Sequence, residues 1–298
     1  MIGTAFIQHV PKLSLQERCM LHELAGHDCR DLTVSRVADL LGRRCSENWN
    51  SDELYDKAAA EAEWLGRNGG GIIPFTSAEY PALLREIYDP PFALCYRGRK
   101  PPAAAPYVAL VGTRKPNGRG ARSAYELAKE LAQGSVPVVS GLARGIDRQA
   151  HEGAIAGGGI TVAVLGSGVA EVGPASSRPT AEKLLSSGGA IFSEYTVFTA
   201  PRRYHFPMRN RIISGMSRCC VILQAPRRSG ALITAEYALE QGRDVFVHSA
   251  CFQKGVGDGG YALYEDGARG ITRADELLEG WNAQWGYSPQ AVRKEQLV

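Results

Sequence analysis

Six short apolar segments alternate with segments of helical character between residues 107 and 248. This alternation limits the possible folds more than any other feature of the sequence. The apolar segments start at Tyr107 and read YVALVG, VPVVSG, ITVAVLG, AIFSEY, CCVILQA and DVFVH. Helices are expected between them at about 119–133, 146–156, 180–187, 209–217 and 231–241. Short strands alternating with helices are typical of a parallel sheet covered on both faces. The sequence therefore predicts a Rossmann-like, doubly wound, mostly parallel α/β fold.

The first seventy residues have a different pattern. Apolar residues recur at helical spacing in LSLQERCMLHEL, TVSRVADLLG and SDELYDKAAAEAEWL, and each segment opens near a serine or threonine that suits a helix N-cap. We expect a small helical domain over residues 1–70. The strands GIIPF and PFALCYRG, around a helix in AEYPALLREI, then open a main domain over residues 71–280. Residues 281–298 form a tail that is too short for another domain.

Composition narrows the class of protein. In 298 residues no apolar run approaches the roughly 20 residues that a membrane-spanning helix needs, and the segment MIGTAFIQHVPKLS does not resemble a secretion signal. The seven cysteines form no CxxC motif, and their odd number is typical of a reducing compartment. We expect a cytoplasmic protein with no membrane partner.

Neither a metal nor a cofactor is expected. The only group suggestive of a metal site is Cys19, His22, His27 and Cys29, whose close spacing fits no standard zinc pattern and is also that of ordinary helix-face residues. The loop GTRKPNGRG lacks the GxGxxG dinucleotide fingerprint, and the chain has no GxxxxGK[ST] loop.

Positive charge gathers in the middle of the chain. The net charge is +3, but residues 107–243 hold 17 Lys and Arg against 9 Asp and Glu, a surplus of eight. Such a surplus suits either a solvated basic face or an anionic partner such as a nucleic acid or a nucleotide.

Glycine-rich loops follow the predicted strands at the edge where ligands bind in such sheets. In SGLARGID, Gly141 and Gly145 allow a tight turn and close approach to an anion, and Arg144 supplies a planar fork for a phosphate. Asp147 and His151, four residues apart on the next helix, are either ordinary helix residues or a catalytic pair. The candidate phosphate-binding residues of the loops are Gly112, Thr113, Arg114, Lys115, Ser140, Gly141, Arg144, Gly145, Gly166, Gly168, Ser229 and Gly230.

A second basic segment, FPMRNRIISG, places Arg209 and Arg211 around Asn210 where a helix is expected to begin. Cations are disfavoured at a helix N-terminus unless an anion is near. The two arginines therefore either pair with carboxylates such as Glu194 or extend the basic groove. Tyr204, His205 and Phe206 just before them are candidates for a surface on which bases stack.

Several of these segments together resemble the DNA-processing protein A family, also called DprA or Smf. They include YPALLREIYDPPFALCYRG, VALVGTRKP, SGLARGIDRQAH, FPMRNRIISG and SGALITAEYALEQGRDVF, and the resemblance runs from about Pro74 to Ile271. It implies an extended Rossmann fold, a sterile-alpha-motif-like helical N-terminus, binding of single-stranded DNA, a homodimer, and loading of the recombinase RecA in natural transformation. We do not expect the C-terminal winged-helix domain that some members have.

The same resemblance assigns residues to a DNA pocket and shows departures from the family. The DNA pocket falls on Gly112, Thr113, Arg114, Gly141, Arg144, Gly145, Arg209, Asn210 and Arg211, with Ser229 and Gly230 nearby. Gly173 stands where a Tyr is usual, Gln224 where a Glu is usual and Tyr261 where an Asn is common, and Ser249 and Ala250 replace a usual Pro-Gly. These departures concern the pocket floor and base preference more than the fold.

The alternative is an enzyme, a phosphoribohydrolase of the lysine-decarboxylase-like family, which carries PGGxGTxxE. The comparable stretch RSGALITAE keeps Gly230 and Glu236 at the matching interval, but Leu232 and Ile233 replace the glycine and threonine that hold the phosphate. Because the chain offers no convincing set of nucleophile, metal or tuned acid, we expect a DNA-binding protein that is not an enzyme. The CCVILQA and DVFVH runs suggest that a dimer forms through the C-terminal edge of the sheet.

Overall fold

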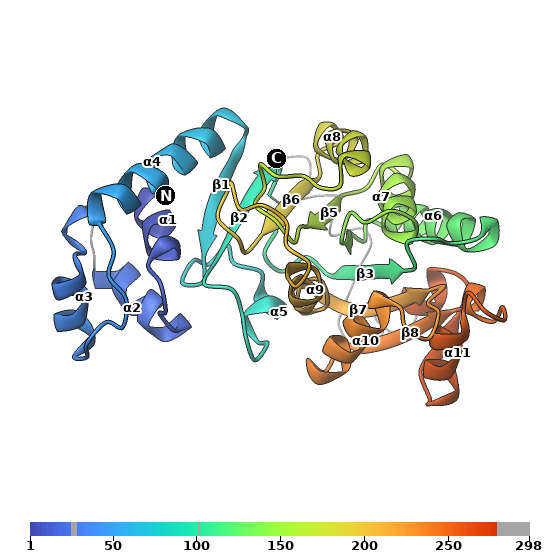
Figure 1. The fold of residues 1–298 in the computed structure, drawn as a ribbon. Coiled ribbons are helices and arrows are strands. Elements are labelled where there is room, and N and C mark those ends of the chain that lie inside the picture. The colour runs from blue at the N-terminus through green and yellow to red at the C-terminus, as the bar shows by residue number, and fades with distance from the viewer. Residues whose placement is uncertain (25–28, 101, 279–298) are drawn as a thin grey trace.

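The computed structural model describes residues 1–24, 29–100 and 102–278. Within this part of the chain, the strands form one sheet in the order β1-β2-β6-β5-β4-β3-β7-β8-β9 (Figure 1). The strands from β6 to β9 in this order are parallel, whereas β1 and β2 extend the sheet in antiparallel fashion beyond β6. The strands are β1 (Gly70–Pro74), β2 (Ala93–Gly98), β3 (Tyr107–Gly112), β4 (Val138–Ser140), β5 (Thr161–Val164), β6 (Ala190–Ser193), β7 (Ser217–Leu223), β8 (Asp244–His248) and β9 (Arg269–Ile271).

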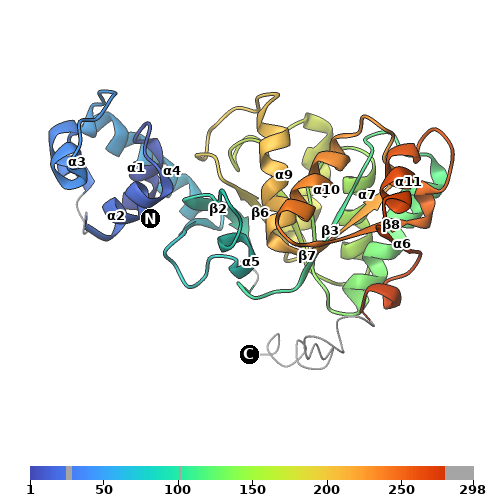
Figure 2. The ribbon, with the colours of Figure 1, turned by 90° about the horizontal axis from the view of Figure 1, so that it is seen from below.

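Helices cover both faces of the sheet, as the alternation of segments predicts. Successive residues of a strand point to opposite faces. Accordingly, Val108 and Leu110 of β3 pack in one core with α6 (Gly118–Gln133) and α7 (Ile146–Ala156). Ala109 and Val111 pack in the other core with α9 (His205–Met216) and α10 (Gly230–Glu240). The doubly wound fold is confirmed, and Figure 2 views it from the side of α9 and α10.

The helical N-terminus contains one helix more than expected. α1 (Ile2–His9) precedes α2 (Leu15–Leu24), α3 (Val34–Leu41) and α4 (Ser51–Arg67). Their apolar side chains form a core of their own that continues onto Phe92 and Ala93 at the start of β2. A domain boundary at residue 70 therefore stays a prediction. The proposed tail, residues 281–298, lies outside the described residues.

Two expectations about single elements are wrong. The helix expected to start at residue 209 starts at His205, because Pro207 falls in its first turn, where no helical hydrogen bond needs its missing N–H. Arg209, Asn210 and Arg211 therefore lie in the middle of α9 and not at its N-terminus. The AEYPALLREI segment forms only the short α5 (Ala82–Arg85).

The apolar runs expected to support a dimer are internal. CCVILQA lies in β7, paired on both sides by β3 and β8, and Cys219 to Leu223 have no exposed surface. DVFVH forms β8, which β9 covers. The outer strand on this side of the sheet is instead β9, which follows α11 (Asp258–Glu265) in the chain.

Strand order reverses between β3 and β7. From β3 the chain proceeds to β4, β5 and β6 on one side, and then returns to β7 on the other. In open α/β sheets, ligands bind outside the carboxyl ends of the strands at such a reversal. The α8 helix (Arg178–Ser186) completes the layer beside α7. None of the helices in the described part of the chain combines the length and hydropathy of a membrane span.

Candidate nucleic-acid interface

A cavity of about 670 Å³ opens at this reversal, between the ends of β3 and β7 and the first turns of α9 and α10. Its walls carry five cations and one carboxylate among the described residues. The lining residues are Val111, Gly112, Thr113, Arg114, Lys115, Ala143, Asp147, Arg203, Phe206, Pro207, Arg209, Asn210, Ile213, Pro226, Arg228, Ser229, Gly230, Ala231, Ile233 and Thr234. The cavity therefore collects residues from the loops after β3, β4 and β7, and from α9 and the residues just before it, into one concave basic surface.

Glycines let the loops that follow β3 and β4 pack directly against each other. A Cβ on Gly112 would lie 1.9 Å from the Leu223 carbonyl oxygen. Gly145 has a φ of +83°, and a Cβ there would lie 2.4 Å from the carbonyl oxygen of Thr113. No side chain fits at either position. These two glycines act by close packing that sets the position of Thr113 and Arg114.

The exposed cations of the cavity are Arg114, Lys115, Arg203 and Arg228. The Arg114 guanidinium lies 5.7 Å from the centre of the Phe206 ring. A cation over an aromatic face is attracted by the ring and keeps its N–H groups free for an anion. Because an arginine fork binds phosphate oxygens well, this corner of the cavity suits a phosphate next to a flat aromatic surface.

The cavity floor is a buried cluster of opposite charges. The Arg209 guanidinium donates to the carbonyl oxygens of Gly141 (2.9 Å) and Val164. The Asp147 carboxylate accepts N–H groups of Gly141 (3.1 Å) and Ala143 (3.3 Å). Burial raises the pKa of Asp147, and the nearby Arg209 and the two N–H donors partly offset this. The floor therefore holds the β4–α7 loop in place by bonds to its backbone.

Polar groups complete the wall on the α10 side. Asn210 donates from Nδ2 to the carbonyl oxygen of Gly230 (3.2 Å), and Ser229 caps α10 by accepting the N–H of Ala231 (3.3 Å). A Cβ on Gly230 would meet open space. This wall offers hydroxyl and amide groups beside the exposed arginines.

Several predicted site residues lie next to the cavity without lining it. Ser140 is buried and donates to the Leu110 carbonyl oxygen (2.6 Å). Arg144 is exposed and donates to Ser176 Oγ (2.9 Å), which directs it toward the β5 side. Gly166 and Gly168 pack against backbone of the segment from Thr196 to Phe206. Gly141 and Gly145 shape the loop behind the lining.

Arg211 points away from the cavity. It makes a bidentate ion pair with Glu194 (2.9 and 2.7 Å) and a third bond to Asp89 (3.1 Å), and its side chain is 8% exposed. Of the two alternatives considered from the sequence, pairing with carboxylates such as Glu194 is the arrangement that the structure has for Arg211.

The possible catalytic groups do not come together. The Nδ1 atom of His151, one turn along α7 from Asp147 and outside the cavity lining, bonds to Thr161 Oγ1 (2.7 Å), while Asp147 holds loop backbone. Burial lowers the pKa of His151 to about 3. Glu236, which the hydrolase alternative requires, is exposed on α10 and does not line the cavity. The arrangement therefore favours binding over catalysis.

Sequence reasoning considered Phe206 only as part of a stacking surface and did not name Arg203 or Arg228 as site residues. Arg228 lies in the loop APRRSG. It could have been found by noting that loops on both sides of the reversal converge at one point. Arg203 carried no such signal, because its place depends on the path of the 194–204 segment.

No metal-binding group of three or more His, Cys, Asp or Glu residues occurs in the described part of the chain. Of the four residues considered from the sequence, His27 lies outside that part. His22 bonds to the hydroxyls of Thr4 (3.1 Å) and Thr76 (3.3 Å).

Comparisons with known proteins show which family this chain resembles. The family model of DNA recombination-mediator protein A matches residues 71–282. The chain is 39% identical to DNA processing protein DprA of Streptococcus pneumoniae, over 67% of the chain and 70% of the relative. It is also 39% identical to Protein Smf of Escherichia coli, over 75% of the chain but only 59% of that relative.

Two solved structures have the same fold. DprA of Streptococcus pneumoniae superposes with a TM-score of 0.74 at 31% identity, and the alignment covers 94% of this chain and 97% of the other. DNA processing protein A of Helicobacter pylori, described for its mode of binding single-stranded DNA, gives a TM-score of 0.62 at 26% identity. That alignment covers 71% of this chain and 94% of the other.

Proposed function

The chain belongs to the DNA recombination-mediator protein A family, and on this premise we propose that the cavity between β3 and β7 binds single-stranded DNA through its phosphates. The observation that carries the proposal is the lining itself, with five cations against one carboxylate at the switch point of the sheet. The single-stranded DNA binding of the Helicobacter pylori relative supports the same ligand.

Arg114 is the principal contact in this proposal. It is exposed, lies over Phe206, and makes no ion pair with any described carboxylate. Phosphate contacts position a strand without reading its sequence, whereas an aromatic ring accepts any base. We therefore expect binding that depends strongly on salt and little on base composition. Arg144, on the side of Ser176, contacts the strand at the rim.

The test is a titration of fluorescent oligonucleotides at several salt concentrations. Each phosphate neutralised on a single strand contributes about 0.7 to the slope of log affinity against log salt, so Arg114→Ala should flatten the slope by about that amount. Arg99→Ala is the matched control. Arg99 is exposed near Pro106 and Pro137, at the amino ends of the parallel strands and therefore away from the cavity. Equal slopes for wild type and Arg114→Ala would refute the proposal.

The bound strand is then passed to a RecA-type recombinase. The role of the family as a recombination mediator supports this step. Strand-exchange reactions in which single-strand-binding protein blocks the recombinase should be stimulated by the chain. A lack of stimulation by a preparation that binds DNA would reject this step alone.

A homodimer is the third part of the proposal. Phe252, Tyr261 and Tyr264 form an aromatic patch beside the edge strand β9, with ring centres 4.8 to 6.1 Å apart. Each of the three is more than 40% exposed. Aromatic side chains are enriched in the buried centre of protein interfaces, so this patch supports association of two chains at the C-terminal edge of the sheet.

A further inference from the structure

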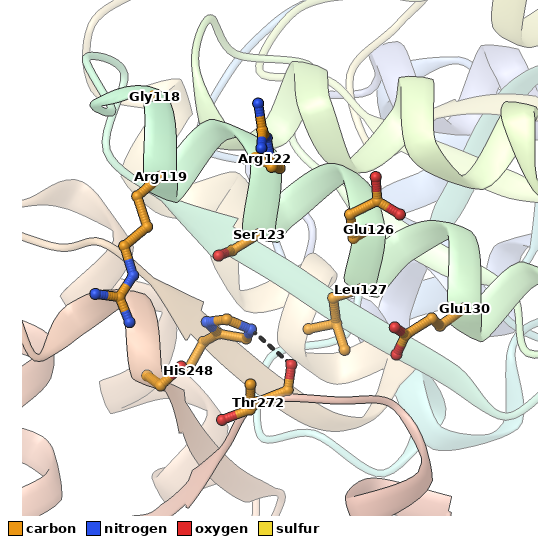
Figure 3. A pocket seen from close by; sticks show the side chains of 10 residues that line it. Gly118, Arg119, Arg122, Ser123, Glu126, Leu127, Glu130, His248 and Thr272 are labelled. Carbon is orange, nitrogen blue, oxygen red and sulfur yellow. Dashed lines mark hydrogen bonds between the residues drawn. The ribbon is translucent and has the colours of Figure 1, made fainter.

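A second cavity, of about 570 Å³, lies at the carboxyl ends of the strands, as the first does. It is enclosed by α6 and the ends of β8 and β9. Figure 3 shows Arg119, Ser123, Leu127 and Glu130 of α6 directed toward His248 and Thr272, with Arg122 and Glu126 on the outer side of the helix. The lining residues are Gly118, Arg119, Arg122, Ser123, Glu126, Leu127, Glu130, His248, Ser249 and Thr272.

The two arginines of this cavity come before its two glutamates along α6. Arg119 and Arg122, in its first turns, are exposed and make no ion pair with a described carboxylate. The hydroxyls of Ser123 and Ser249 also line the cavity. Glu126 follows Arg119 by seven residues, which is about 10 Å along a helix axis, whereas it follows Arg122 by four residues and so lies next to Arg122 on the helix surface. Glu130 lies further on and already accepts the N–H of Ala274 (2.9 Å). One end of the cavity is therefore basic and hydroxyl-rich.

His248 forms an uncharged wall. Its Nδ1 accepts the N–H of Ala250 (3.0 Å), so the proton sits on Nε2, which donates to the Thr272 carbonyl oxygen (3.0 Å). Burial, and to a lesser degree Arg119, lower the pKa of His248, while Thr272 and nearby carboxylates act in the opposite direction. The positive charge at the basic end thus comes from Arg119 and Arg122.

One short loop separates the two cavities. Thr113 to Lys115 line the first, and Gly118 and Arg119 line the second. Asn117, between them, is fixed by Gln224, which accepts its backbone N–H (3.1 Å) and donates to its side-chain oxygen (2.7 Å). Four residues span at most about 14 Å, so Lys115 and Arg119 are close enough for one strand to reach both.

We propose that the basic end of the second cavity binds a phosphodiester of the same DNA strand, through Arg119 with Arg122 at its rim. This rests on the proposed function of the first cavity and extends it. The strand leaves Arg114 and Lys115, crosses the loop pinned by Gln224, and meets Arg119. Glu126 and Glu130 mark the end of the favourable path, because carboxylates repel phosphate.

The experiment compares a dinucleotide, whose single internal phosphodiester can occupy only one of the two sites, with an oligonucleotide of about 16 nucleotides, the upper end of the site sizes usual for single-strand binding modules. With the longer one, Arg119→Ala should flatten the salt slope by about 0.7, and Arg119→Ala/Arg122→Ala should flatten it further. With the shorter one, which the first cavity accommodates, Arg119→Ala should bind like wild type. Glu126→Gln should leave the slope unflattened, and Arg99→Ala again serves as the control.

The outcomes separate the two proposals. If Arg114→Ala weakens both lengths but Arg119→Ala and the double variant match wild type with both, the second site is refuted and the first stands. If neither Arg114→Ala nor Arg119→Ala changes any slope, the proposed function itself fails. If Arg119→Ala weakens both lengths equally, Arg119 belongs to the first site and the separate second site is refuted. Circular dichroism confirms that each variant is folded.

Discussion

At the scale of single residues, positions that carry no charge decide where the charged ones lie. Gly145 is an example, because its positive φ and its contact with the Thr113 carbonyl oxygen place the β4–α7 loop against the Arg114 backbone. Gln224 is another, because its side chain fixes Asn117 and its own φ is +45°. The arginines can act together only because these neighbours hold their loops.

Gly145→Ala should lower both stability and DNA affinity. The added Cβ meets two backbone carbonyl groups in a left-handed conformation, which costs on the order of 1–3 kcal/mol, and relief of the clash moves Arg114. Urea unfolding and the salt titration measure the two effects. Gly158→Ala is the control, since it has a φ of +73° but nothing within 4 Å. Unchanged DNA binding in a destabilised Gly145→Ala would contradict the role given to this contact.

His151 should make stability depend on pH. Thr161 donates its hydroxyl to the Val138 carbonyl oxygen (3.1 Å) and so accepts a hydrogen bond from the Nδ1–H group of His151, which leaves the buried Nε2 without a partner. Because burial lowers the folded pKa to about 3, the unfolded chain takes up a proton first as pH falls below about 6.5.

The free energy of unfolding should therefore decrease between pH 6.5 and pH 4, by on the order of 1 kcal/mol per pH unit at most from this group. His151→Asn retains a donor for Thr161 but cannot titrate, so its unfolding free energy should decline less over the same range. Urea denaturation at a series of pH values measures this. If the unfolding free energies of wild type and His151→Asn change with pH in parallel, His151 is not the source of the pH dependence.

At the scale of elements, α9 divides its arginines between two tasks. Residues two apart on a helix point to different sides. Arg209 accordingly faces the sheet and holds Gly141, while Arg211 faces Glu194 and Asp89. Had α9 begun at residue 209, as the sequence led us to expect, both arginines would lie in its first turn. With the earlier start, Arg211 connects α9 to Glu194 at the end of β6 and to Asp89 in the segment before β2.

Arg211→Gln should reduce stability without changing the salt slope. It leaves the partly buried carboxylate of Glu194 without its bidentate partner, and breaking a buried pair costs about 3–5 kcal/mol. Chemical denaturation should show this loss, and folded Arg211→Gln at low temperature should bind oligonucleotides with the wild-type slope. A flattened slope like that expected for Arg114→Ala would instead place Arg211 in the DNA path.

At the scale of the whole molecule, the described sheet presents two different borders. On one border, β1 and β2 join the sheet to the helical N-terminus, whose core includes Phe92. On the other, β9 is the edge strand, and the aromatic patch of Phe252, Tyr261 and Tyr264 lies beside it. The β9 border is thus the place where a second chain can add without covering the wall of the first cavity on β3.

Tyr261→Glu should shift the chain from dimer to monomer. A carboxylate buried in an aromatic interface loses its hydration without gaining a partner. Sedimentation at micromolar concentration measures the change, and Tyr88→Glu is the control, because Tyr88 is fully exposed on the α5–β2 segment. A Tyr261→Glu protein that sediments like wild type, with wild type a dimer, would move the interface elsewhere.

The fold class and the loops that carry the site could be predicted from the order of the residues alone. Strands and helices differ in apolar period, and parallel strands must end at one edge, so the order of residues along the chain was enough to group Arg114, Gly141 and Ser229. Which side chains face the cavity depends on how the helices pack on the sheet, and this could not be predicted from the sequence. Arg211 and Arg209 have the same chemistry and nearly the same position in the chain, but helix phase and the location of Glu194 separate them. The nearness of Arg119 to the ends of β8 and β9 likewise depends on sheet order, because contacts across more than a hundred residues leave no local pattern.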